Sequence, residues 1–138
     1  MIGFDDYDDY EDDWYSGVAN KEAYEEIGRI RSEIFPPGSE IVPLHAREQY
    51  KTVVRRLRRM KLSRCSSGFR NAFDDYVAEL ETFAETWPTA GDAVTTVVTS
   101  IIAGFAALPM HVANYLNQRA SAKRLDAKRR RLNELAHP

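Results

Sequence analysis

Residues that could perform acid–base, nucleophilic or metal chemistry are few in this chain and lie far apart. The three histidines are His45, His111 and His137, and none has a metal-binding partner at ligand spacing. The single cysteine, Cys65, follows a basic stretch that could lower its pKa, but no histidine partner is identifiable, so a plain thiol is predicted. Glycine-rich phosphate loops and Gly-x-Ser-x-Gly elbows are also missing from the sequence. We therefore expect a non-enzymatic protein with no catalytic, cofactor-binding or metal-binding residues.

The first sixteen residues combine acids with regularly spaced aromatic residues. They include seven acids and no Lys or Arg. The rings of Phe4, Tyr7, Tyr10 and Trp14 are three, three and four residues apart, a spacing that shares one face of a helix. Alone, this segment is predicted to be disordered, because its charges repel and nothing offsets the entropy of ordering. The rings favour a recognition segment that docks on a basic, apolar groove, and a plain acidic tail is the alternative.

Charge occurs in four blocks of alternating sign, although the net charge of the 138 residues is only −2. Residues 1–40 carry a net charge of −9, residues 41–70 +8, residues 71–92 −6 and residues 93–138 +5. Such blocks indicate charged partners, or blocks that pair with one another within one chain or between copies. In the alternative, each block is only the solvated face of a helix.

Three amphipathic helices are predicted in the first two thirds of the chain. The first covers residues 20–35, with Asn20 as its N-cap, and a Pro-Pro-Gly-Ser run ends it. The second covers about residues 43–62, with Pro43 in its first turn, and the third covers about residues 69–86 after a break with capping serines. The short link favours an antiparallel hairpin of one basic and one acidic helix.

The segment 93–118 contains no Lys, Arg, Asp or Glu and can be interpreted in two ways. It exceeds the roughly 20 residues that cross a bilayer, and basic residues follow it, so residues 93–113 could span a membrane. Its threonines, Pro109 and His111 favour instead a helix buried at the centre of a soluble bundle. We favour the buried helix and expect Pro109 to kink or interrupt it.

Basic side chains cluster in the second predicted helix and after the apolar segment. Both clusters could contact phosphates, anionic lipid or an acidic protein segment. The balancing acidic blocks argue against a dedicated nucleic-acid binder, whose whole domain is usually basic. The candidate basic surface consists of Arg47, Lys51, Arg55, Arg56, Arg58, Arg59, Lys123, Arg124, Lys128, Arg129, Arg130 and Arg131.

The predicted fold is an all-α bundle of about four helices. It comprises an acidic-aromatic tail (1–16), a helical domain (17–118) whose hairpin packs on the long apolar helix, and a basic helical C-terminal extension (119–138) that projects from the core or meets a partner. The leading hypothesis is that the chain is a structural subunit of a larger complex, for example of a viral or phage particle. Helix packing would hold the complex together, with the tail docked on copies of the same chain or on other subunits.

Two further functions remain as alternatives. The first is a membrane-anchored protein with residues 93–113 in the bilayer, and the second is a nucleic-acid-associated protein that uses helix 43–62 and the basic C-terminus. The acidic N-terminal residues argue against a secretory signal and against mitochondrial import. We therefore expect a non-secreted protein in the cytoplasm or in an assembled particle, or at a membrane if the segment spans one.

Overall fold

The structure, a computed structural model, is α-helical wherever it shows regular secondary structure. It describes the backbone of residues 2–87 and 108–138 and the side chains of residues 16–42, 44–87 and 116–138. Within these residues it has no strands, so the predicted all-α class is confirmed. The four helices described are α1 (Ile2–Ile34), α2 (Pro43–Arg58), α3 (Ser67–Glu85) and α5 (Leu108–Ala136).

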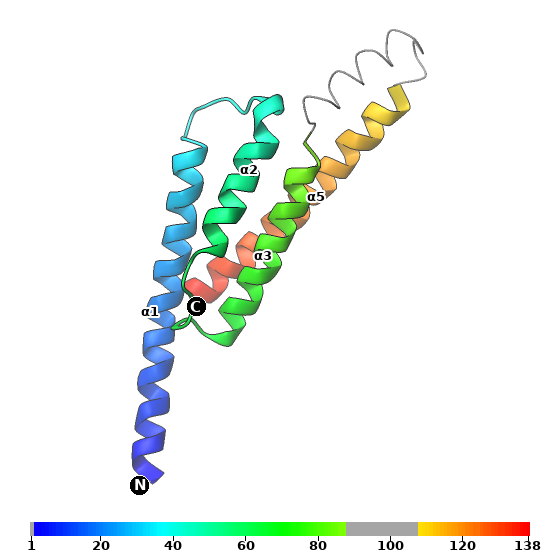
Figure 1. Ribbon diagram of the computed structural model, residues 1–138. Coiled ribbons are helices and arrows are strands. Elements are labelled where there is room, and N and C mark those ends of the chain that lie inside the picture. Colours follow the sequence, from blue (N-terminus) through cyan, green and yellow to red (C-terminus); the bar gives the residue numbers. More distant parts are fainter. Residues whose placement is uncertain (1, 88–107) are drawn as a thin grey trace.

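The four helices pack as a bundle from which one end of α1 projects. The chain runs up α1, down α2, up α3 and down α5 (Figure 1). α2 packs against α1 and α3, and α5 packs against α3 and α1. The N-terminal part of α1 extends well beyond the other helices, on the same side as the loop that joins α2 to α3 (Figure 1). We refer to residues 2–16 as the projecting end.

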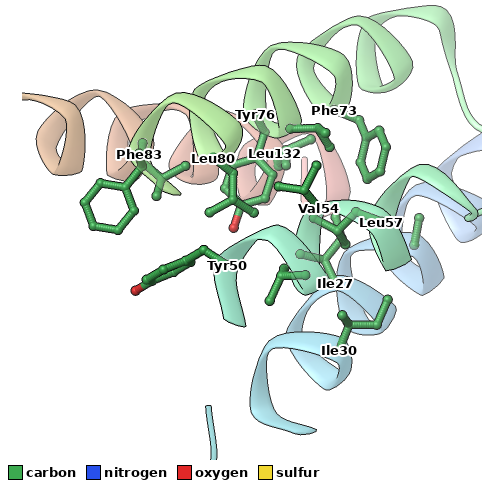
Figure 2. Close-up of a cluster of buried hydrophobic side chains, with 14 of the residues drawn as sticks. Ile27, Ile30, Tyr50, Val54, Leu57, Phe73, Tyr76, Leu80, Phe83 and Leu132 are labelled. Carbon is green, nitrogen blue, oxygen red and sulfur yellow. The ribbon is translucent and has the colours of Figure 1, made fainter. Parts of the chain in front are cut away.

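Buried apolar side chains from all four helices form one core (Figure 2). In α1 and α3 they recur at spacings of three and four residues, as the sequence pattern predicted. Burial of each large apolar side chain stabilises the fold by about 1.5–3 kcal/mol. The largest apolar or aromatic side chains that are fully buried are Tyr76, Phe69, Leu57, Leu80, Leu132 and Val53.

The start of the first helix differs from the prediction. α1 begins at Ile2 instead of Asn20, so the backbone of the acidic-aromatic segment continues the helix. Asn20 is buried in the middle of α1, where its Nδ2 donates to Ser66 Oγ and its Oδ1 accepts from the Ser66 backbone N–H, both at 3.0 Å. The N-cap assignment was therefore wrong. That the projecting end needs a partner to become ordered stays a prediction.

The break between α2 and α3 is longer than predicted. α2 ends at Arg58, before the predicted end at residue 62, because Met60 and Leu62 leave the helix to pack against the core. Ser66 then caps α3 by accepting a hydrogen bond from the Phe69 backbone N–H at 3.2 Å. The capping serine predicted for this break is confirmed.

The sequence predicted that the basic C-terminal segment projects from the core or meets a partner. In the structure the segment does not project. Its helix lies against α1 and α3 and buries Ser121, Leu125, Leu132 and Ala136. These four residues share one helical face. Ser121 and Ala136, at its two ends, extend the weak stripe of leucines that the sequence shows. α5 also runs without a break across the predicted boundary at residue 119, so the segment is the fourth wall of the bundle.

The predicted apolar helix lies mostly in residues 88–107, which are outside the residues that the structure describes. Most of the candidate membrane span 93–113 belongs to the same stretch. Of the helices that are described, none contains a stretch long and apolar enough to cross a bilayer. Pro109 is the second residue of α5 as described, and the residues before Leu108 lie outside the described part, so the predicted kink or interruption at Pro109 stays a prediction.

Replacement of Tyr76 by phenylalanine tests the packing of the core. Its hydroxyl is buried with no hydrogen-bond partner among the described residues, and burial raises the pKa of this group, so it is protonated at neutral pH. An unpaired buried hydroxyl is destabilising, and Tyr76→Phe should therefore raise the free energy of unfolding by about 1 kcal/mol, measured by urea denaturation. Tyr24→Phe is the control, because the Tyr24 hydroxyl accepts from Arg129 at 3.4 Å and its removal should not stabilise. A less stable Tyr76→Phe protein would contradict this packing.

Candidate functional site

Helices of opposite charge alternate around the bundle. α1 has eleven acidic and three basic residues, and α3 has five acidic residues and one basic residue. α2, in contrast, has five basic residues and one acidic residue, and α5 has seven basic and two acidic residues. The four main helix contacts, α1–α2, α2–α3, α3–α5 and α1–α5, therefore each join an acidic helix to a basic one. The charge blocks of the sequence are thus used, at least in part, inside one chain.

Ion pairs connect α2 to both of its neighbours. Arg56 lies 2.6 Å from Glu33 of α1, and on the other side Arg58 pairs with Glu81 of α3. All four side chains are between 36% and 57% exposed, so water screens them and each pair contributes at most about 1 kcal/mol. These pairs orient α2 more than they stabilise it.

Glu79 is the buried charged residue at the contact of α3 with α5. Its carboxylate, only 11% exposed, accepts from Ser121 Oγ at 3.2 Å and from Arg124 Nε at 3.0 Å. Lys128 Nζ lies 3.6 Å from its other oxygen. Because all three donors come from one face of α5, Glu79 sets the register of α5 on α3. A carboxylate surrounded by donors of its own chain is a structural contact.

The reactive side chains that the structure describes are not assembled into a chemical centre. Cys65 is buried in the α2–α3 loop, where desolvation raises the pKa of its thiol and the charge of Arg70 opposes the shift. The ring of His137 packs edge-on against Tyr24, with centroids 5.7 Å apart. Among the described residues, no group of three His, Cys, Asp or Glu could hold a metal ion. The side chain of His111 lies outside them.

Most of the candidate basic residues are engaged with their own chain. Arg47 caps the end of α3 by donating from Nε to the Trp87 carbonyl at 2.8 Å and from Nη2 to the Glu85 carbonyl at 2.6 Å. The hydrogen bond from Arg129, with the nearby charge of Arg130, holds the pKa of Asp126 below its usual value. Ion pairs within the chain also occupy Arg56, Arg58, Arg124, Lys128, Arg130 and Arg131.

A basic ridge remains on the outer side of α2. Lys51 and Arg55 are four residues apart and so share one helical face, on which Arg55 is exposed. On α5, Lys123 is exposed in the same way. The two helices touch acidic neighbours on both sides, so the basic surfaces of α2 and α5 do not merge into one.

A groove of about 790 Å³ lies between α1 and the end of α2 with the loop that follows it, and we call it the α1–α2 groove. Its floor is apolar, and Glu22 and Glu26 of α1 stand on one side. Sequence reasoning included Arg56 and Arg59 in the candidate basic surface but missed the groove itself, because only the return of the loop to α1, through Asn20 and Ser66, brings the two walls together. The floor contains Ala19, Ala23, Ile30, Met60 and Cys65, and the basic wall contains Arg56, Arg59, Lys61 and Arg64.

The aromatic positions of the projecting end fall on the face of α1 that is turned away from the bundle. At about 100° per residue, positions 4, 7, 10 and 14 lie on average roughly opposite the positions that α1 buries in the bundle. Val18 continues this stripe and is 39% exposed. The acidic positions 5, 8, 9, 12 and 13 lie on the bundle side of the helix. The side chains of residues 2–15 themselves are outside the described part.

Comparisons with protein-family models, curated proteins and solved structures find no match to this chain. Conclusions about function therefore rest on its own contacts, charges and helix geometry.

Replacement of Glu79 tests the contact between α3 and α5. Glu79→Ala leaves the buried Ser121 hydroxyl without its acceptor, so the free energy of unfolding should fall by about 2 kcal/mol in urea denaturation. Glu79→Gln retains an acceptor oxygen and should lose less. Glu81→Ala, which breaks only an exposed pair with Arg58, should cost about 0.5 kcal/mol. Equal losses for the two alanine variants would show that Glu79 has no special role.

Proposed function

We propose that this chain is a non-enzymatic assembly subunit that binds neighbouring subunits through the projecting end of α1. The observation that supports this proposal is the separation of charge between the projecting end and the bundle. Residues 2–16 contain seven acids and no Lys or Arg, whereas all nineteen Lys and Arg residues lie further along the chain. The described residues from 17 onward include thirteen acids, which leaves that part of the molecule positively charged.

Charge separated in this way makes one copy complementary to another. The acids of the projecting end lie outside the bundle, where they cannot neutralise most of its basic surface (Figure 1). A second copy presents the same positive bundle, and attraction between opposite charges favours that encounter. Association of this kind weakens as salt screens the charges.

The aromatic stripe adds a second contact surface to the projecting end. Large aromatic side chains dominate the energetics of many interfaces, and Phe4, Tyr7, Tyr10 and Trp14 share one side of the helix. Five of the seven acidic positions lie on the other side. A helix with two different faces can contact two neighbours at once, as a subunit inside a larger complex must.

The two alternative functions have less support from the described residues. A dedicated nucleic-acid surface would be continuous and basic, but acidic helices flank the basic surfaces of both α2 and α5. The membrane alternative depends on the segment 93–113, most of which is outside the described part.

Deletion of residues 1–16 tests the proposal. In sedimentation velocity at about 50 mM salt, where screening is weak, the intact chain should self-associate, and salt of about 500 mM should reverse this. The deleted chain should stay monomeric. Far-UV circular dichroism of both forms serves as the control for folding. If both forms are equally monomeric at high concentration in low salt, association through the projecting end is wrong.

A further inference from the structure

We propose that the α1–α2 groove is the surface on which the projecting end of a second copy docks, with its acidic face toward the basic wall. This inference rests on the proposed assembly function and identifies the receiving surface.

The basic wall of the groove contains cations that can pair with an acidic occupant. Arg59, Lys61 and Arg64 have no carboxylate partner among the described side chains, whereas Arg56 on the same wall is held by Glu33. Of the two acids on the opposite side, Glu26 is already paired with Arg29, so Glu22 is the one carboxylate of the groove that competes with the occupant. Three available cations therefore face an occupant that carries five aspartates on one helical face, and this charge complementarity selects an acidic helix.

The groove also has the length that a helical occupant requires. Its residues on α1 run from Ala19 to Ile30, which at 1.5 Å per residue corresponds to about 17 Å. The acidic positions 5 to 13 span about 12 Å of helix. The acidic face is therefore short enough to fit within the length of the groove along α1.

The position of the groove makes reciprocal exchange possible. The groove lies at the end of the bundle from which α1 projects, because Ser66 in the α2–α3 loop is bonded to Asn20 there (Figure 1). The straight helix α1 leads away from its own groove, so the projecting end reaches the groove of another copy more readily. Two copies that exchange ends form a closed dimer with two-fold symmetry.

The distribution of residues around α1 agrees with such an exchange. Five of the seven acidic positions lie on the bundle side of the helix, and in an antiparallel pair of α1 helices this side meets the basic wall of the partner. The aromatic stripe lies on the opposite side and stays outside the dimer. It is thus left for a further subunit.

Complementation between two full-length variants tests the groove. The groove variant combines Arg59→Glu with Arg64→Glu. The tail variant replaces five aspartates of the projecting end by asparagine, which keeps their shape and removes their charge. Each variant alone should self-associate about tenfold or more weakly than the wild type in low salt. A mixture of the two should form a one-to-one complex, because the acidic end of the groove variant can enter the intact groove of the tail variant. The substitutions of the tail variant are Asp5→Asn, Asp8→Asn, Asp9→Asn, Asp12→Asn and Asp13→Asn.

Two controls separate the groove from other surfaces. Lys51→Glu with Arg55→Glu makes the same change in charge on the outer ridge of α2 and should leave association unchanged. A Tyr7→Ala, Tyr10→Ala, Trp14→Ala variant keeps every acid and should retain the salt-sensitive dimer. Circular dichroism confirms that each variant is folded, and the mixed sample guards against a variant that fails to associate because it is misfolded.

The outcomes distinguish this inference from the proposed function. If deletion of residues 1–16 prevents association but the groove variant still associates, the groove is the wrong surface and the assembly function stands. If Lys51→Glu with Arg55→Glu weakens association as much as the groove variant does, or if the mixture stays monomeric, the inference is also overturned. Loss of the dimer in the aromatic variant but not in the tail variant would assign docking to the other face of the helix. A wild type that is monomeric in low salt refutes both proposals.

Discussion

The packing of the second half of α5 between α1 and α3 is the contact on which the rest of this bundle depends. It places Leu132, which is fully buried, among core side chains of the other three helices (Figure 2). It also brings Ser121 and Arg124 to Glu79, so the one buried charge of the described residues is compensated. An unpaired buried carboxylate would be strongly destabilising, so α3 and α5 can pack in few other registers.

Alternation of charge around the bundle follows from this contact. With α5 opposite α2, each basic helix lies between two acidic ones, and the main helix contacts are attractive. Exposed pairs such as Arg58–Glu81 contribute little energy individually, but like-charged neighbours would be repelled. The sign of each charge block therefore favours one arrangement of the helices over the others. The charge pattern thus contributes more to the specificity of the fold than to its stability.

The projecting end of α1 is the part of the charge pattern that this internal pairing does not use. None of the other described helices lies alongside it, and its aromatic positions lie on the face of α1 that is turned away from the bundle (Figure 1). Acids are in excess outside the bundle and bases are in excess within it, so the molecule as a whole has a negative end and a positive end. It gives an encounter between copies a preferred orientation, because dipolar molecules attract most strongly with opposite ends adjacent.

The sequence by itself determined the helical class, the extents of α2 and α3 to within a few residues, and the capping serine at Ser66. These features depend on local periodicity and turn chemistry, which neighbouring residues decide. Only the tertiary structure decided that Asn20 bonds to Ser66 instead of capping a helix, that Ser121 and Ala136 are buried, and that Lys61 and Arg64 join α1 in a groove. An asparagine, a small residue or an exposed base is compatible with several environments, and contacts with residues distant in sequence select among them.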